Sequence, residues 1–153
     1  IDGLTLELIA DGMHLPPELL RLIFKIKDMS KITACSDSMR GAGMGDGPSI
    51  LGPKNNGTDV IVEDGIAKMP DRTCFAGSVA TGERLLKTLL LMMHIAPSKA
   101  AYLLSLHPSI IVGLDKDIGS IKKDKYADLL ILDENANIKT VILGGNTVKR
   151  DKI

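Results

Sequence analysis

Two polar clusters, each directly after an apolar, strand-like run, contain the residues of this sequence best suited to chemistry. Asp11-Gly12-Met13-His14 follows the run at residues 4–10, and Ser36-Asp37-Ser38 follows the run at 32–35. The helical pattern between them predicts a parallel, right-handed β-α-β unit. Ionisable groups just beyond the carboxyl ends of parallel strands are where α/β folds usually carry their chemistry. The sequence therefore predicts an enzyme active site at this edge of the sheet.

Asp37 is the first candidate for a catalytic group. A carboxylate at the mouth of a parallel strand can take a proton from water and pass it to a leaving group. An aspartate in this place can equally cap the turn after the strand. Residue types alone leave both roles open.

The first cluster offers His14 as a second candidate. Its imidazole could donate a hydrogen bond to a substrate carbonyl, although a surface-loop histidine fits the spacing equally well. Gly12 would let the backbone turn sharply or approach a ligand closely. Asp11 is interpreted first as a structural residue that orients the loop through backbone N–H groups.

A third segment, Ala76-Gly77-Ser78, precedes a predicted helix that Thr81 caps. Its small side chains leave N–H groups free for an anion or a sugar hydroxyl near a helix N-terminus. A short Gly-Ser turn has many other uses, so this pattern is a weak indication of binding.

The remaining patterns predict the elements that position these groups. Pro16 and Pro17 fit the first turn of a helix, Gly- and Pro-rich residues 40–57 predict a loop, and an Asp-Gly turn at 64–65 predicts a hairpin. Alanine and leucine spacing predicts a further helix from residue 96 to Pro108. After residue 113, strands at 127–133, 138–143 and 146–149 predict an antiparallel sheet.

Composition limits the kind of protein further. The chain has 153 residues, 44% of them hydrophobic, which suffices for one core but not for an eight-fold β/α barrel of about 250 residues. Nineteen basic and nineteen acidic residues balance, so nothing indicates a nucleic-acid partner. The longest apolar stretch, near residues 89–93, is too short for a membrane span. Residue 1 is Ile, and the sequence reads as if it began within a strand, which indicates a fragment.

Histidine and cysteine spacing argues against a metal site within the chain. The histidines show neither an HxH nor an HExxH pattern, and His94 and His107 are interpreted as residues at helix C-termini. Cys35 and Cys74 fit no zinc or redox motif. We interpret both as reduced thiols of a cytoplasmic protein.

In order and spacing, these segments resemble a known enzyme family. Residues 7–14 (Glu-Leu-Ile-Ala-Asp-Gly-Met-His), 36–47 (beginning Ser-Asp-Ser-Met) and 75–78 (Phe-Ala-Gly-Ser) are similar to motifs of N-acetylglucosamine-6-phosphate deacetylases. Residues 118–133, with Gly-Ser-Ile and Ala-Asp-Leu-Leu-Ile-Leu-Asp, resemble the tail of the wider amidohydrolase superfamily. Phe75 stands where the family commonly has Leu.

The resemblance implies an α/β fold: the C-terminal part of a metal-dependent-hydrolase TIM barrel plus the last strands of a small β domain. Residues 1–113 would hold barrel strands seven and eight and the closing helices, with a loop and hairpin excursion at 40–73. Residues 114–153 would belong to the β domain. Both sheets would then have unpaired edges.

The resemblance also implies a reaction, the removal of acetate from N-acetylglucosamine 6-phosphate. Asp37 would be the general acid and base, and His14 would contact the sugar and polarise the amide carbonyl. Asp11, Gly12, Met13, Phe75, Ala76 and Gly77 would line the substrate. A divalent metal, zinc by preference, would be held by ligands outside this chain, because the family's glutamate and two histidines have no counterparts here.

The same resemblance implies a homodimer for the complete enzyme, because a basic residue of the family reaches the substrate phosphate across the dimer interface. That residue has no counterpart in this chain. The isolated chain is then expected to be inactive. Two alternatives stay open: a non-catalytic module that binds a sugar phosphate or a partner chain, and an amidohydrolase acting on another N-acyl sugar or a cyclic amide.

Overall fold

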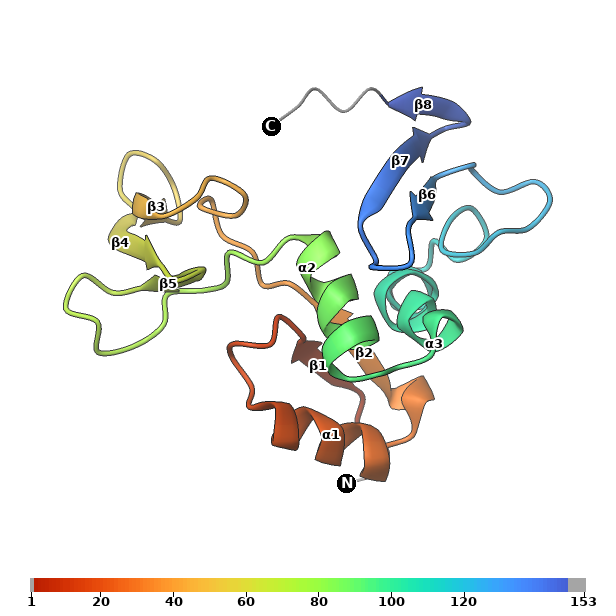
Figure 1. Cartoon of the computed structure of the whole chain (residues 1–153), viewed down its shortest axis with the longest axis horizontal. Coiled ribbons are helices and arrows are strands. Elements are labelled where there is room, and N and C mark those ends of the chain that lie inside the picture. Colours follow the sequence, from red (N-terminus) through yellow and green to blue (C-terminus); the bar gives the residue numbers. More distant parts are fainter. Residues whose placement is uncertain (1, 149–153) are drawn as a thin grey trace.

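The computed structural model describes residues 2–148, which form an α/β body flanked by two small antiparallel sheets (Figure 1). The strands are β1 (Leu6–Ile9), β2 (Ile32–Cys35), β3 (Gly47–Leu51), β4 (Thr58–Glu63), β5 (Ile66–Lys68), β6 (Leu129–Leu132), β7 (Ile138–Leu143) and β8 (Asn146–Val148). The α-helices are α1 (Pro17–Ile26), α2 (Gly82–Lys87), α3 (Pro97–Ala101) and α4 (His107–Ile111). A 3₁₀ turn occupies Met29–Lys31, and π-helical turns continue α2 through Thr88–Met92 and α3 through Tyr102–Leu106.

The body is the predicted β-α-β unit. β1 pairs with β2 in parallel, with Leu6 opposite Ile32 and Ile9 opposite Cys35. The prolines at the start of α1 lie where a missing backbone N–H costs nothing, as predicted. Within residues 2–148 neither strand pairs with a further strand, so this sheet has two open edges.

One face of the β1–β2 sheet packs against the helices to form the main core. Alternate strand residues point to this face, which is why Leu8 and Ala34 are buried there. The helices contribute aliphatic side chains, and Leu20, Leu89 and Leu103 are completely buried. A second, smaller core under the β3–β5 sheet is formed by Val60, Val62, Ala67 and Ala76.

The excursion between β2 and α2 contains more strand than the sequence predicted. The hairpin of β4 and β5 is confirmed, but β3 forms inside the segment expected to be a loop and pairs with β4. The prediction missed β3 because Gly47 and Pro48 weaken its strand pattern. Proline is tolerated there because β3 lies at the edge of its sheet, where an N–H can go unpaired.

The sequence predicts that the helical segment near residue 97 ends at Pro108, and this prediction is wrong. The segment continues through α4 to Ile111. Proline lacks an N–H and disturbs the turn before it, and a π-helical turn at Tyr102–Leu106 directly precedes α4.

His107 therefore does not lie at a helix C-terminus, and that prediction is wrong. Its side chain is buried, its Nδ1 lies 2.6 Å from the carbonyl oxygen of Ile32, and its ring stacks on Tyr102. His107 thus joins the helical segment to β2. The C-terminal strand predictions are confirmed within the described residues, because β6, β7 and β8 form an antiparallel sheet in that order. Lys149, the last residue of the third predicted strand, lies outside the described residues.

The predicted cap of α2 is also confirmed, since the Thr81 hydroxyl oxygen accepts a hydrogen bond from the backbone N–H of Arg84 at 3.3 Å. We expect Thr81→Ala to lower the free energy of unfolding by about 1 kcal/mol, the usual loss when a capping oxygen is removed. Urea denaturation measures this change. Thr81→Ser is the matched control, because it keeps the oxygen; an equal loss in both variants would contradict the capping role.

Candidate active site

The two predicted polar clusters lie together beyond the carboxyl ends of β1 and β2, because the strands are parallel and in register. Backbone hydrogen bonds join a third segment to the second of these clusters. The N–H of Ser78 donates to the carbonyl oxygen of Asp37 at 3.1 Å, and the N–H of Met39 donates to the carbonyl oxygen of Ser78 at 2.8 Å. The loop before α2 is thereby fixed beside the loop after β2.

Asp11 lies at the centre of the first cluster and is only 3% exposed. Its Oδ1 accepts hydrogen bonds from the backbone N–H groups of Met13 and His14, at 2.9 and 3.0 Å. Its Oδ2 accepts a hydrogen bond from the Ser78 hydroxyl at 3.1 Å and lies 2.9 Å from Nδ1 of His14. The carboxylate is therefore fully engaged within the protein.

Burial on its own would raise the pKa of the Asp11 carboxyl. The hydrogen bonds from the backbone of His14 and Met13 and from the His14 ring outweigh burial, and the pKa lies below its ordinary value. Asp11 is therefore ionised at neutral pH.

His14 is held on two sides. Besides the contact of Nδ1 with Asp11, its ring meets Phe75 edge to face, with ring centroids 5.2 Å apart and an interplanar angle of 67°. The His14 side chain is 15% exposed, and Phe75 is 47% exposed. Sequence reasoning placed both residues in the site, and the structure brings their rings together.

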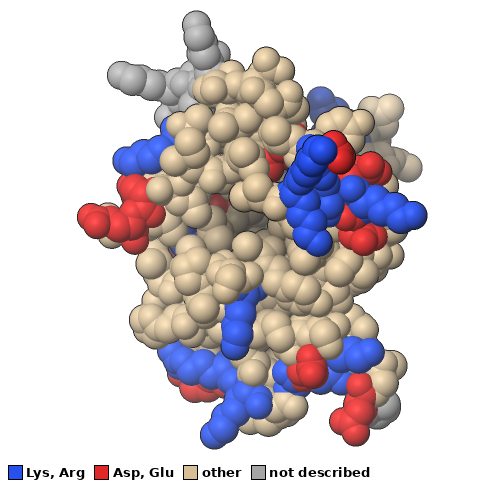
Figure 2. Space-filling model, turned by 90° about the vertical axis from the view of Figure 1, so that its right-hand side faces the viewer, with Lys and Arg blue, Asp and Glu red and all other residues tan. Residues whose placement is uncertain are grey.

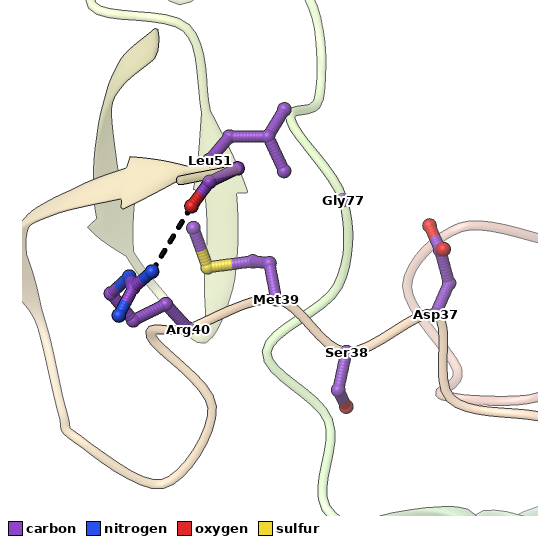
Figure 3. A pocket seen from close by; sticks show the side chains of 7 residues that line it. Asp37, Ser38, Met39, Arg40, Leu51 and Gly77 are labelled. Carbon is purple, nitrogen blue, oxygen red and sulfur yellow. Dashed lines mark hydrogen bonds between the residues drawn. The ribbon is translucent and has the colours of Figure 1, made fainter. Parts of the chain in front are cut away.

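Asp37 lines a cavity of about 610 Å³ between the loop after β2 and the segment that holds Gly77 (Figure 3). The other lining residues are Ser38, Met39, Arg40, Leu51, Gly52 and Gly77. Asp37 is exposed, and its φ of +47° places it in the left-handed region that aspartate tolerates better than most residues. Asp37 and Arg40 are the charged members of this lining, and Arg40 donates a hydrogen bond to the carbonyl oxygen of Gly52 at 3.0 Å.

Gly12 and Gly77 both adopt positive φ, and at Gly12 this agrees with the sharp turn that the sequence predicts. A Cβ on Gly12 would lie 3.2 Å from the terminal methyl of Met92, so this glycine lets the first loop pack closely against the end of the helical segment. Met13, its neighbour, is 38% exposed. Asp11, Gly12 and Met13 line a second cavity of about 550 Å³, beside α2.

The backbone N–H groups of Ala76 and Ser78 are not free, so these two groups cannot bind an anion or a sugar hydroxyl as predicted, while the binding role of Gly77 stays a prediction. Ala76 donates to the carbonyl oxygen of Ala67 at 2.9 Å, and Ser78 donates to Asp37. The small residues of this segment instead allow close backbone pairing with the neighbouring strand and loop.

Sequence reasoning missed the role of Arg84. Its Nε donates to the carbonyl oxygen of Asp11 at 3.1 Å, and its Nη1 donates to the carbonyl oxygen of Gly65 at 2.7 Å. Arg84 thus fixes the hairpin turn of the excursion to the first site loop. An arginine in the first turn of a helix gives no signal in the sequence that could have revealed this contact.

The side chains of residues 2–148 do not fit a metal site. No three His, Cys, Asp or Glu side chains of this part of the chain come together so that they could hold an ion. Both cysteines are free thiols. Burial, together with the nearby Glu7 carboxylate, raises the pKa of the Cys35 thiol, which therefore stays protonated at neutral pH and is a poor ligand.

The surface drawn in Figure 2 carries basic and acidic side chains mixed along its margin, around a hollow among uncharged residues. This face has no basic stripe of the kind that follows a nucleic-acid backbone. In the part of the chain that the structure describes, no helix is both long and apolar enough to cross a bilayer.

Comparisons with known proteins agree on one family. The model of the amidohydrolase family matches residues 2–148. The chain is 29% identical to a putative N-acetylgalactosamine-6-phosphate deacetylase of Escherichia coli K12, covering 92% of this chain and 80% of that protein. It is 31% identical to the N-acetylglucosamine-6-phosphate deacetylase of Bacillus subtilis, covering 95% of this chain but 35% of the relative.

The crystal structure of N-acetylglucosamine-6-phosphate deacetylase from Thermotoga maritima has the same fold over 99% of this chain, with a TM-score of 0.85 and 34% identity. The match spans 40% of that protein. The predicted α/β fold, as a part of such an enzyme, is confirmed.

Proposed function

Because the chain belongs to the amidohydrolase family, whose members are generally metal-dependent hydrolases, we propose that it forms the C-terminal part of an amino-sugar-phosphate deacetylase. The proposed reaction converts N-acetylglucosamine 6-phosphate to glucosamine 6-phosphate and acetate. The observation that carries the proposal is the parallel pairing of β1 and β2, which brings Asp37 and His14 to one sheet edge.

In this proposal Asp37 moves the protons. Its carboxylate takes a proton from the water that attacks the amide carbonyl, and a tetrahedral intermediate forms. The C–N bond then breaks, and Asp37 returns the proton to the departing amine nitrogen, so that acetic acid and the amine are released and exchange a proton to give acetate and the ammonium form. The exposure of Asp37 and its place on a cavity of about 610 Å³ support this role.

The substrate-binding surface is proposed to be lined by His14, Gly12, Met13, Phe75 and Gly77. The partly exposed rings of His14 and Phe75 offer a polar and an apolar contact side by side, which suits a sugar ring and its substituents. Asp11 and Ala76 are buried, so they would support the residues of this surface and would not contact the sugar themselves.

The divalent metal of the family, which we propose to be zinc, would be held by residues other than 2–148, because these residues offer no ligand set. The complete enzyme is proposed to be a homodimer. The open edges of the β1–β2 sheet are compatible with further strands from the remainder of the enzyme.

We expect the 153-residue chain alone to release no measurable amine from N-acetylglucosamine 6-phosphate, even with Zn²⁺ added, since residues 2–148 bring together no three side chains that could hold the ion. A hybrid enzyme, in which residues 2–148 replace the matching part of the Thermotoga maritima deacetylase, should regain turnover. Amine release measures both. Equal turnover by the chain and the hybrid enzyme would contradict the proposed division of the site.

N-acetylgalactosamine 6-phosphate is a second candidate substrate. The observation that favours it is the similarity to the Escherichia coli relative named for that sugar, at 29% identity. The two substrates differ in configuration at one ring carbon. Comparing kcat/KM of the hybrid enzyme for both sugars decides between them, and a higher value for the galacto sugar would overturn our first choice.

A further inference from the structure

We infer that Asp11 and Ser78 form a positioning pair that holds His14 with its ring proton on Nδ1, so that the neutral ring offers Nε2 to the substrate as a hydrogen-bond acceptor. The inference rests on the proposed function only in taking His14 as a residue that contacts substrate. It assigns Asp11, which family resemblance places among the substrate-lining residues, to a role behind the site.

The position of the proton follows from the hydrogen bonds of Asp11. An ionised carboxylate can only accept hydrogen bonds. Since Oδ2 of Asp11 lies 2.9 Å from Nδ1 of His14, the proton between them must be carried by Nδ1. Oδ1 already accepts two backbone N–H groups, so the carboxylate cannot turn away from the ring without losing both.

Ser78 fixes the second oxygen of the carboxylate. Ser78 is 1% exposed, and its hydroxyl oxygen accepts a hydrogen bond from the N–H of Ala80 at 3.0 Å. The hydroxyl proton is therefore directed at Oδ2 of Asp11, 3.1 Å away. The backbone of the same residue pairs with Asp37 and Met39. Ser78 thus links the His14 loop to the Asp37 loop.

Phe75 restrains the plane of the imidazole, because its ring lies edge to face with His14. With Nδ1 bound to Asp11 and one side of the ring against Phe75, Nε2 is the ring nitrogen left for a ligand. A neutral imidazole protonated at Nδ1 has only a lone pair at Nε2. That nitrogen can accept a hydrogen bond from a sugar hydroxyl or from the amide N–H of the substrate.

The family resemblance implies that His14 polarises the amide carbonyl. With the ring proton on Nδ1, His14 can do so only in its doubly protonated, charged form. Donation from Nε2 to a carbonyl oxygen requires a protonated ring, for which the Asp11 carboxylate is the counter-ion. The neutral ring selects substrates that present a donor at this position.

Nitrogen-15 NMR of the imidazole ring tests the inference without substrate or turnover, so a negative result would leave the proposed function standing. The 153-residue chain is titrated until the His14 ring is neutral, and the tautomer is read from the two ring nitrogen signals. We expect protonated Nδ1 and unprotonated Nε2. Protonated Nε2 in the unmodified chain would overturn the inference.

Two variants test the positioning pair. In Asp11→Asn the carbonyl oxygen must face the two backbone N–H groups, so the amide NH₂ faces Nδ1 and should convert the neutral ring to the Nε2–H form. Ser78→Ala removes one donor to Oδ2 and should give a detectable fraction of that form.

Ser109→Ala is the matched control, because Ser109 is also buried and its hydroxyl donates to the carbonyl oxygen of Leu106, far from the site. The tautomer of His14 should be the same in Ser109→Ala as in the unmodified chain. If Asp11→Asn and Ser78→Ala keep the unmodified pattern, the positioning role is wrong; if Asp11→Asn does not fold, Ser78→Ala and the unmodified chain still decide.

Discussion

Asp37→Asn is expected to lower kcat of the hybrid enzyme by about 10²- to 10⁴-fold, the usual contribution of a general acid or base. Asparagine has nearly the same shape and tolerates the positive φ of this position, so the fold should survive. It cannot take a proton from water at neutral pH. Steady-state amine release measures the loss, and circular dichroism checks that the fold is kept.

Asp124→Asn is the matched control. Asp124 is likewise exposed and has a positive φ, of +69°, but it lies in the turn before β6, away from the β1–β2 edge. It should leave kcat unchanged. An Asp37→Asn enzyme that kept the activity of this control would remove Asp37 from the proposed reaction and leave it as a turn residue.

Leu89→Ala is expected to lower the free energy of unfolding by about 2–5 kcal/mol, because it opens a cavity in a close-packed core. Leu89 is completely buried among β1, β2 and the helices. Since a domain of this size is stabilised by only about 5–15 kcal/mol, this substitution would remove a large share of its stability. Urea denaturation measures the change.

Leu91→Ala provides the comparison from the same helical segment. Leu91 is 49% exposed, two residues further along, and its truncation should cost no more than about 0.5 kcal/mol. Equal losses for the two variants would show that the core is not where the structure places it.

The elements with local signals were predicted well from the sequence. The β-α-β unit, the 64–65 hairpin turn and the Thr81 cap each depend on neighbouring residues, through hydrophobic spacing, a turn dipeptide or a capping oxygen. Such signals act over a few residues, so the sequence carries them directly. β3 was missed because its strand character comes from pairing with β4 and not from its own Gly- and Pro-rich residues.

The site divides in the same way. The sequence by itself determined which residues could carry chemistry, since Asp37 and His14 each follow an apolar run that is recognisable as a strand from its own residues. Only the tertiary structure decided which distant residues hold the site loops and the strands in place. Ser78 reaches Asp11 across 67 positions, Arg84 reaches it across 73, and His107 reaches Ile32 across 75. Contacts between residues so far apart are set by how the strands and helices pack, and no local pattern encodes them.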